Sequence, residues 1–81
     1  MQLQFYQVRY FLALARTLNF TRAAEQCNVT QPALTKAVQK LEQELGGGLI
    51  HRERHLTQLT ELGKMILPTL EKILAAAEAV R

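Results

Sequence analysis

Apolar residues return at steps of three or four along most of this 81-residue chain, the spacing that gathers them on one side of a helix. One such stripe covers residues 3–18, a second lies within residues 30–45, and the longest begins after Thr60. A chain of this length builds a single hydrophobic core. The pattern therefore predicts one mainly helical domain.

The first two predicted helices are separated by a short break. The stripe of the first, over residues 3–18, consists of Phe5, Val8, Phe11, Leu12, Ala15 and Leu18. Thr21 is the predicted cap of a short helix over residues 22–27, because its hydroxyl can accept from a free backbone N–H of the first turn. Asn28 then predicts a tight turn, since Asn tolerates unusual backbone angles.

The third predicted helix begins at the cap Thr30, has Pro32 in its first turn and ends near residue 45. One face is apolar and carries Leu34, Val38, Leu41 and Leu45. The opposite face carries Gln31, Pro32, Thr35, Lys36, Gln39 and Gln43. Amides and hydroxyls can hydrogen-bond to base edges, and Lys36 and Lys40 can reach phosphates, although a solvated helix face has the same composition.

Three glycines at 46–48 end this helix, and two short apolar segments follow at 49–50 and 56–59. Between them lies a polar tip made of Arg52, Glu53, Arg54 and His55. The arrangement predicts a two-stranded hairpin, or wing.

Thr60 and Glu61 open the last predicted helix. Its stripe consists of Leu62, Met65, Ile66, Leu70, Ile73, Leu74, Ala77 and Val80. A helix of this length spans about 30 Å, which is more than a small three-helix body can cover, so the stripe predicts a second copy as partner. Pro68 lies inside the helix and predicts a local bend.

The composition limits the classes of function that the chain can have. A net charge of +3 permits nucleic-acid binding, and the single cysteine, Cys27, cannot form an internal disulfide, which fits a cytoplasmic protein. We expect Cys27 to pack in the core. No apolar run is long enough to cross a bilayer, and the first residues lack a secretory signal. The chain has no Ser and no Asp, and His51 and His55 sit in the predicted hairpin, so we expect no enzyme activity, metal or cofactor.

These residues, in this order, resemble the LysR-type transcriptional regulators along nearly the whole chain. The matching segments are Leu3 through Tyr10-Phe11, Asn19 to Ala24, Val29 to Lys36, Leu41-Glu42, Glu44 to Gly46, Leu49 with Arg52, and Leu59-Thr60 with Gly63. Gly47-Gly48 and Ile50 depart from the family pattern, which predicts a looser entry into the wing. Thr35 and Lys36 stand where Ser and Arg are commoner.

The resemblance implies a winged helix-turn-helix over residues 1–59, with a three-helix core and a short two-stranded wing, followed by a dimerising linker helix over residues 60–81. It also implies a C-terminal effector-binding domain that this chain lacks, so we expect a DNA-binding fragment of a larger regulator. That parent would form higher oligomers and bind a small-molecule effector. The expected partners are double-stranded promoter DNA and a second copy, with no membrane.

The resemblance assigns roles to individual residues, with residues 30–45 as the recognition helix in the major groove. The expected base-reading residues are Gln31, Pro32, Thr35, Lys36 and Gln39. The expected contacts to the DNA backbone are Thr21, Arg22, Thr30 and Lys40, and those of the wing are Arg52, Arg54 and His55. The expected dimer helix uses Leu62, Ile66, Leu70, Ile73 and Ala77. The alternative function is a helical dimerisation or adaptor module that does not bind DNA.

Overall fold

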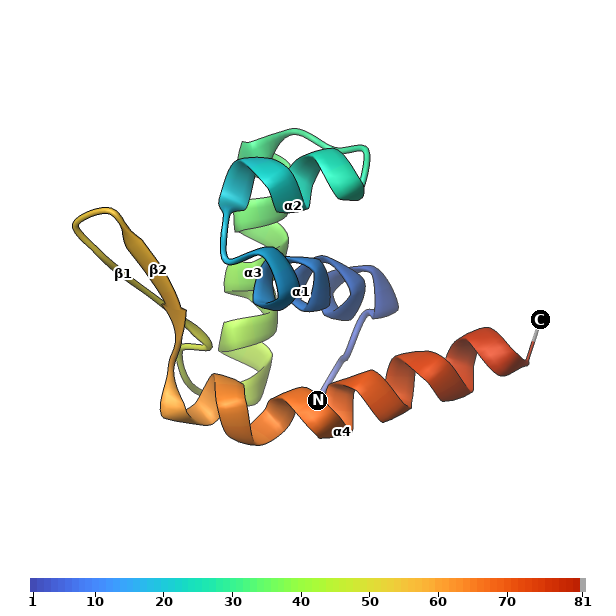
Figure 1. The fold of residues 1–81 in the computed structure, drawn as a ribbon. Coiled ribbons are helices and arrows are strands. Elements are labelled where there is room, and N and C mark those ends of the chain that lie inside the picture. The colour runs from blue at the N-terminus through green and yellow to red at the C-terminus, as the bar shows by residue number, and fades with distance from the viewer. Residues whose placement is uncertain (81) are drawn as a thin grey trace.

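Four helices and one hairpin make up the computed structural model, which describes residues 1–80 (Figure 1). The elements are α1 Phe5–Thr17, α2 Phe20–Gln26, α3 Gln31–Leu45, β1 Ile50–Glu53, β2 Leu56–Leu59 and α4 Glu61–Ala79. This order confirms the predicted winged helix-turn-helix with a long final helix. Arg81, the last residue of the predicted linker helix, lies outside the described residues.

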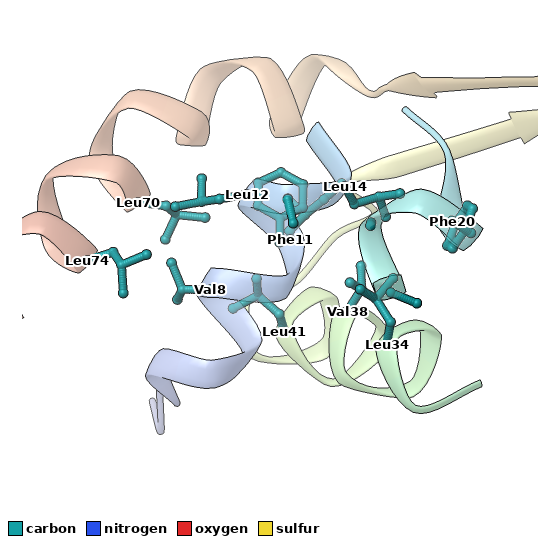
Figure 2. Close-up of a cluster of buried hydrophobic side chains, with 14 residues drawn as sticks. Val8, Phe11, Leu12, Leu14, Phe20, Leu34, Val38, Leu41, Leu70 and Leu74 are labelled. Atoms are coloured by element: carbon teal, nitrogen blue, oxygen red, sulfur yellow. The ribbon is translucent and has the colours of Figure 1, made fainter. Parts of the chain in front are cut away.

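The hydrophobic core lies where α1, α2 and α3 meet, and α4 closes one side of it (Figure 2). The largest fully buried side chains are Phe11, Leu14, Leu34, Leu41, Leu49, Leu70 and Val8. Leu70 and Leu74 of α4 lie beside Val8 and Leu12 of α1 in Figure 2. The final helix is therefore part of the same folded body as the first three.

The ends of α1 correct two predictions. Phe5 and Leu18 are 49% and 43% exposed, so neither belongs to the buried stripe. Phe5 is the first residue of the helix, and Leu18 follows the last one with a left-handed φ of 50°, which turns its side chain away from the core.

The start of α2 also differs from the prediction. Asn19, not Thr21, caps this helix: its side-chain oxygen accepts from the backbone N–H of Arg22 at 2.9 Å. The helix begins at Phe20, whose ring is buried, and this earlier start places Thr21 in the first turn with an exposed side chain. The predicted turn at Asn28 is confirmed by its φ of 57°.

The third helix begins and ends as predicted. The Thr30 hydroxyl accepts from the backbone N–H of Ala33 at 3.2 Å, and Pro32 lies in the first turn. At the other end Gly46 has a φ of 80°, a conformation that glycine adopts without steric cost.

The wing is an antiparallel pair in which Ile50 lies opposite Leu59 and Glu53 opposite Leu56. The predicted polar tip was too long, because Arg52 and Glu53 belong to β1 and only two residues form the turn. The first of these two, Arg54, has a positive φ of 57°. Such two-residue turns favour left-handed backbone angles because these match the twist of the flanking strands.

The last helix begins as predicted, since the Thr60 hydroxyl accepts from the backbone N–H of Gly63 at 3.0 Å. Gly63 packs directly against the carbonyl oxygen of Leu49, where no larger side chain would fit without a shift. The helix continues through Pro68 to Ala79, and its C-terminal part extends beyond the other helices (Figure 1). Within residues 1–80, no helix is long and apolar enough to cross a membrane.

Leu70 corrects the predicted dimer helix. Its side chain is only 1% exposed and packs against α1, so a partner helix cannot reach it. The apolar stripe of α4 is wide, and its inner part covers the core of the same chain. Leu62, Ile66, Ile73 and Ala77 are half-buried and flank that inner part.

Candidate nucleic-acid interface

The polar face of α3 is open to solvent. Gln31, Pro32, Lys36 and Gln39 are exposed, and Thr35 is half-buried. Two clefts border this face on opposite sides. Lys36 and Lys40 line one of them with Tyr6 of α1, while Thr35 and Gln39 line the other with Arg52 of the wing.

Arg52 is fixed by an aromatic neighbour. Its guanidinium carbon lies 4.4 Å from the centre of the Phe20 ring, the geometry of a cation–π contact. Phe20 is buried at the start of α2, so the contact ties the wing to the second helix. The sequence did not predict this role of Phe20. The local signal is weak: an apolar residue between Asn19 and Thr21, either of which can cap a helix.

A polar cleft joins three elements around Arg52. It is lined by Leu18, Asn19, Phe20, Thr21, Gln31, Arg52, His55 and Thr57, from α2, α3, the wing and the turn before α2. Four of these, Thr21, Gln31, Arg52 and His55, were predicted separately as DNA contacts. Their hydroxyl, amide, guanidinium and imidazole groups are the kinds that contact phosphate oxygens and base edges.

The structure does not bring all predicted residues to this cleft. Arg22 is exposed on α2 and lines neither this cleft nor the one between α3 and β1. Arg54 lines a hollow on the hairpin itself with His51 and Gln58. Lys40 lies on the α1 side of α3. The predicted contacts therefore spread over the width of α3 and the length of the wing.

Two acidic side chains, Glu53 in the wing and Glu42 on α3, have partners in the wing region. Oε2 of Glu53 lies 3.2 Å from Nε2 of His51, an exposed contact of small energetic weight. The carboxylate of Glu42 accepts hydrogen bonds from the backbone N–H groups of Leu49 and Ile50 at 2.7 and 3.2 Å. Sequence reasoning missed Glu42, because its partners lie beyond the glycines in the wing.

The structure does not gather His51, His55 and Cys27 into one cluster. Among the described residues, no three His, Cys, Asp or Glu side chains lie close enough together to hold a metal ion. Cys27 is half-buried and packs against the core. Burial raises the pKa of its thiol, against smaller lowering effects of Arg16 and Arg9, and a raised pKa disfavours the reactive thiolate.

The chain is similar to known regulators and to domains solved with DNA. It is 45% identical over 74 residues to the HTH-type transcriptional regulator IlvR of Caulobacter vibrioides, covering 91% of this chain and 25% of that protein. The Vibrio fischeri DarR structure, a complex with DNA, matches with a TM-score of 0.93 and 35% identity over 98% of this chain and 27% of DarR. A CbnR DNA-binding-domain complex with DNA matches with a TM-score of 0.90 and 35% identity over 96% of this chain and 90% of that one.

The model of the bacterial regulatory helix-turn-helix proteins of the lysR family matches residues 5–64. This range includes all three helices of the core, the wing and the start of α4. The chain spans about a quarter of the length of the curated relatives it matches. It belongs to the lysR family of bacterial regulatory helix-turn-helix proteins, with the DNA-binding fold of that family.

Proposed function

We propose that this chain binds double-stranded DNA sequence-specifically, as the reading part of a transcription regulator. The observation that carries the proposal is the shared polar cleft, where Gln31 of α3 lies with Thr21 of α2 and Arg52 of the wing. A helix in the major groove needs cationic and hydroxyl groups on both sides to hold the flanking phosphates. The similar domains solved with DNA support the same assignment.

The proposed roles follow the position of each residue. Gln31, Pro32, Thr35, Lys36 and Gln39 read base edges from α3; Thr21, Arg22, Thr30 and Lys40 contact the DNA backbone; Arg52, Arg54 and His55 act from the wing. An amide such as that of Gln31 can make a two-pronged contact with adenine, while Lys36 offers guanine a single charged donor. The proposal assigns the chain no catalytic role, in keeping with relatives that are named as regulators.

We further propose that residues 60–81 pair two copies of the chain, while residues 1–59 form the reading unit. Leu62, Ile66, Ile73 and Ala77 are half-buried beside the inner part of α4, so part of each side chain stays accessible, and Met65 is 73% exposed. A symmetric dimer presents two recognition helices, so its half-sites should lie about 34 Å apart, one turn of B-DNA, in a partly palindromic operator.

For the whole protein, we propose a cytoplasmic regulator that forms higher oligomers and responds to a small-molecule effector. The support is the length of the curated relatives: the part that this chain matches is about a quarter of each of them. In such a protein the present chain supplies DNA recognition and pairing.

Selection from a pool of randomised duplexes, followed by fluorescence anisotropy across a salt series, tests DNA recognition. We expect enrichment of a partly palindromic sequence that binds at least about 10³-fold more tightly than a scrambled duplex. The logarithm of the affinity should fall linearly with the logarithm of the salt concentration, because phosphate contacts release counterions. No enriched sequence, or no binding at low salt, would contradict the proposal and favour an adaptor module.

A further inference from the structure

The connection between α3 and the wing consists of three consecutive glycines, residues 46–48. Glycine has the widest choice of backbone angles, so this sequence predicts that the wing can change its position relative to α3. In the structure, hydrogen bonds hold this connection on both sides.

Glu42 accepts four hydrogen bonds from residues 46–50, which comprise the glycines and the first residues after them. Its backbone carbonyl oxygen accepts from the N–H groups of Gly46 and Gly47 at 2.9 and 3.1 Å. Its side-chain Oε2 accepts from the N–H groups of Leu49 and Ile50 at 2.7 and 3.2 Å. The carboxylate thus spans the glycines and joins the last turn of α3 to the first residue of β1.

The start of α4 holds the same connection from the other side. The Thr60 hydroxyl donates to the carbonyl oxygen of Gly48 at 2.6 Å, and its backbone N–H donates to that of Leu49 at 3.0 Å. Gly63 packs against the Leu49 carbonyl as well. Thr60 holds the base of the wing to α4, and Glu42 holds it to the recognition helix by hydrogen bonds.

Glu42 also lies where a change in the wing would matter for DNA. It lines the cleft between α3 and β1 together with Gln39 and Arg52, and Gln39 is three residues earlier on the same helix. Any rotation of β1 about the glycines would change the spacing between Arg52 and the reading face of α3.

We propose that Glu42 is a positioning residue that fixes the position of the wing relative to the recognition helix. Arg52 then contacts DNA at a constant distance from the bases that α3 reads. The inference rests on the proposed function and adds to it a residue that does not itself touch DNA. Its carboxylate acts through the N–H groups of Leu49 and Ile50.

Positioning and simple electrostatics predict opposite effects for Glu42→Gln. The amide oxygen is a weaker acceptor than the carboxylate, so the wing loosens and DNA binding weakens. Removal of a negative charge close to DNA would by itself strengthen binding. Glu44→Gln is the matched control: it removes the same charge from the same helix, and the exposed Glu44 carboxylate accepts from the backbone N–H of Gln2, away from the wing.

The experiment measures anisotropy and hydroxyl-radical footprints of both variants on the selected duplex. We expect Glu44→Gln to bind as tightly as the unchanged chain or more tightly, and Glu42→Gln to bind about three- to tenfold more weakly. The footprint of Glu42→Gln should lose protection beside the wing and keep it in the major groove. Equal or tighter binding by Glu42→Gln, or a uniform loss of protection, would overturn the inference.

A double-mutant cycle with Arg52→Ala adds a second arm. If Glu42 acts through the wing, Glu42→Gln should change affinity by less than about twofold once Arg52 is absent. An undiminished effect in that background would contradict the inference. Hydrogen exchange of the unchanged, DNA-free chain covers the case in which Glu42→Gln fails to fold: the Leu49 and Ile50 amides should be protected, and rapid exchange would overturn the inference.

The two proposals fail in different ways. If the unchanged chain selects no duplex, the proposed function fails before any variant is made. If the unchanged chain binds its selected duplex and Glu42→Gln leaves an identical footprint, only the role of Glu42 fails.

Discussion

The two long helices, α3 and α4, begin and pack in the same way but differ in the apolar surface that they leave accessible. Each begins at a threonine cap, Thr30 in one and Thr60 in the other, and each buries leucines in the same core. Outside that core, α3 presents amides, a hydroxyl and lysines. The exposed residues of α4 include charged ones such as Lys64 and Lys72, but this helix also presents Met65 and a row of half-buried apolar side chains.

This difference indicates what each helix binds. A polar helix face gains little from contact with an apolar surface and much from hydrogen-bonding groups and phosphates. An exposed apolar flank is stabilised by a second apolar helix. The comparison therefore supports the proposal that α3 binds DNA and that α4 pairs with another copy of the chain.

The largest expected effect is the difference in the free energy of unfolding between variants on the inner and outer sides of α4. Leu70→Ala should lower the free energy of unfolding by about 2–5 kcal/mol, because it leaves a cavity against α1. Met65→Ala, at a position 73% exposed, should change it by less than about 0.5 kcal/mol at a concentration where the chain is monomeric. Urea denaturation of both variants measures the contrast, and equal losses would remove the distinction between inner and outer sides.

The next effect tests the polar face of α3 without involving the core. Gln31→Ala should weaken binding to the selected duplex by about 1–3 kcal/mol and leave stability unchanged, because the side chain is exposed. Gln43→Ala is the control, since Gln43 is also exposed on α3 but lies near its C-terminal end. Similar losses for both variants, measured by anisotropy, would contradict a reading role for the N-terminal part of the helix.

The smallest expected effect is the difference in stability lost when each of the two threonine caps is removed. Thr30→Ala should cost about 1 kcal/mol of stability, the usual value for a lost cap. Thr60→Ala should cost about 2 kcal/mol, because Thr60 also donates to the carbonyl of Gly48 in the wing base. Thermal denaturation at one fixed concentration gives the ranking, and a larger loss for Thr30→Ala would show that the bond to Gly48 adds nothing.

The sequence predicted those parts of the fold that local chemistry decides. Periodic apolar residues identified α1, α3 and α4, and Thr30, Thr60 and Gly46 were assigned correctly because their partners lie within a few residues. The cap of α2 was assigned wrongly, since Asn19 and Thr21 are both suitable. The choice depends on the burial of Phe20, which is a tertiary effect.

Other features depend on contacts that no local pattern contains. The stripe of α4 is wider than the surface that α1 covers, so its spacing alone could not tell that Leu70 faces inward. The contact of Arg52 with Phe20 joins two residues that are far apart in the chain. The hydrogen bonds of Glu42 to Leu49 and Ile50 likewise depend on the path of the glycine connection, which the sequence does not specify.

The measurement that tests the comparison most directly is a titration of the ¹⁵N-labelled chain with the selected duplex, followed by NMR. We predict that the amide signals of Gln31, Lys36 and Arg52 shift with DNA, while that of Met65 on the outer side of α4 stays in place once the dimer has formed. Shifts confined to α4, with the α3 signals unchanged, would contradict the assignment of DNA to α3.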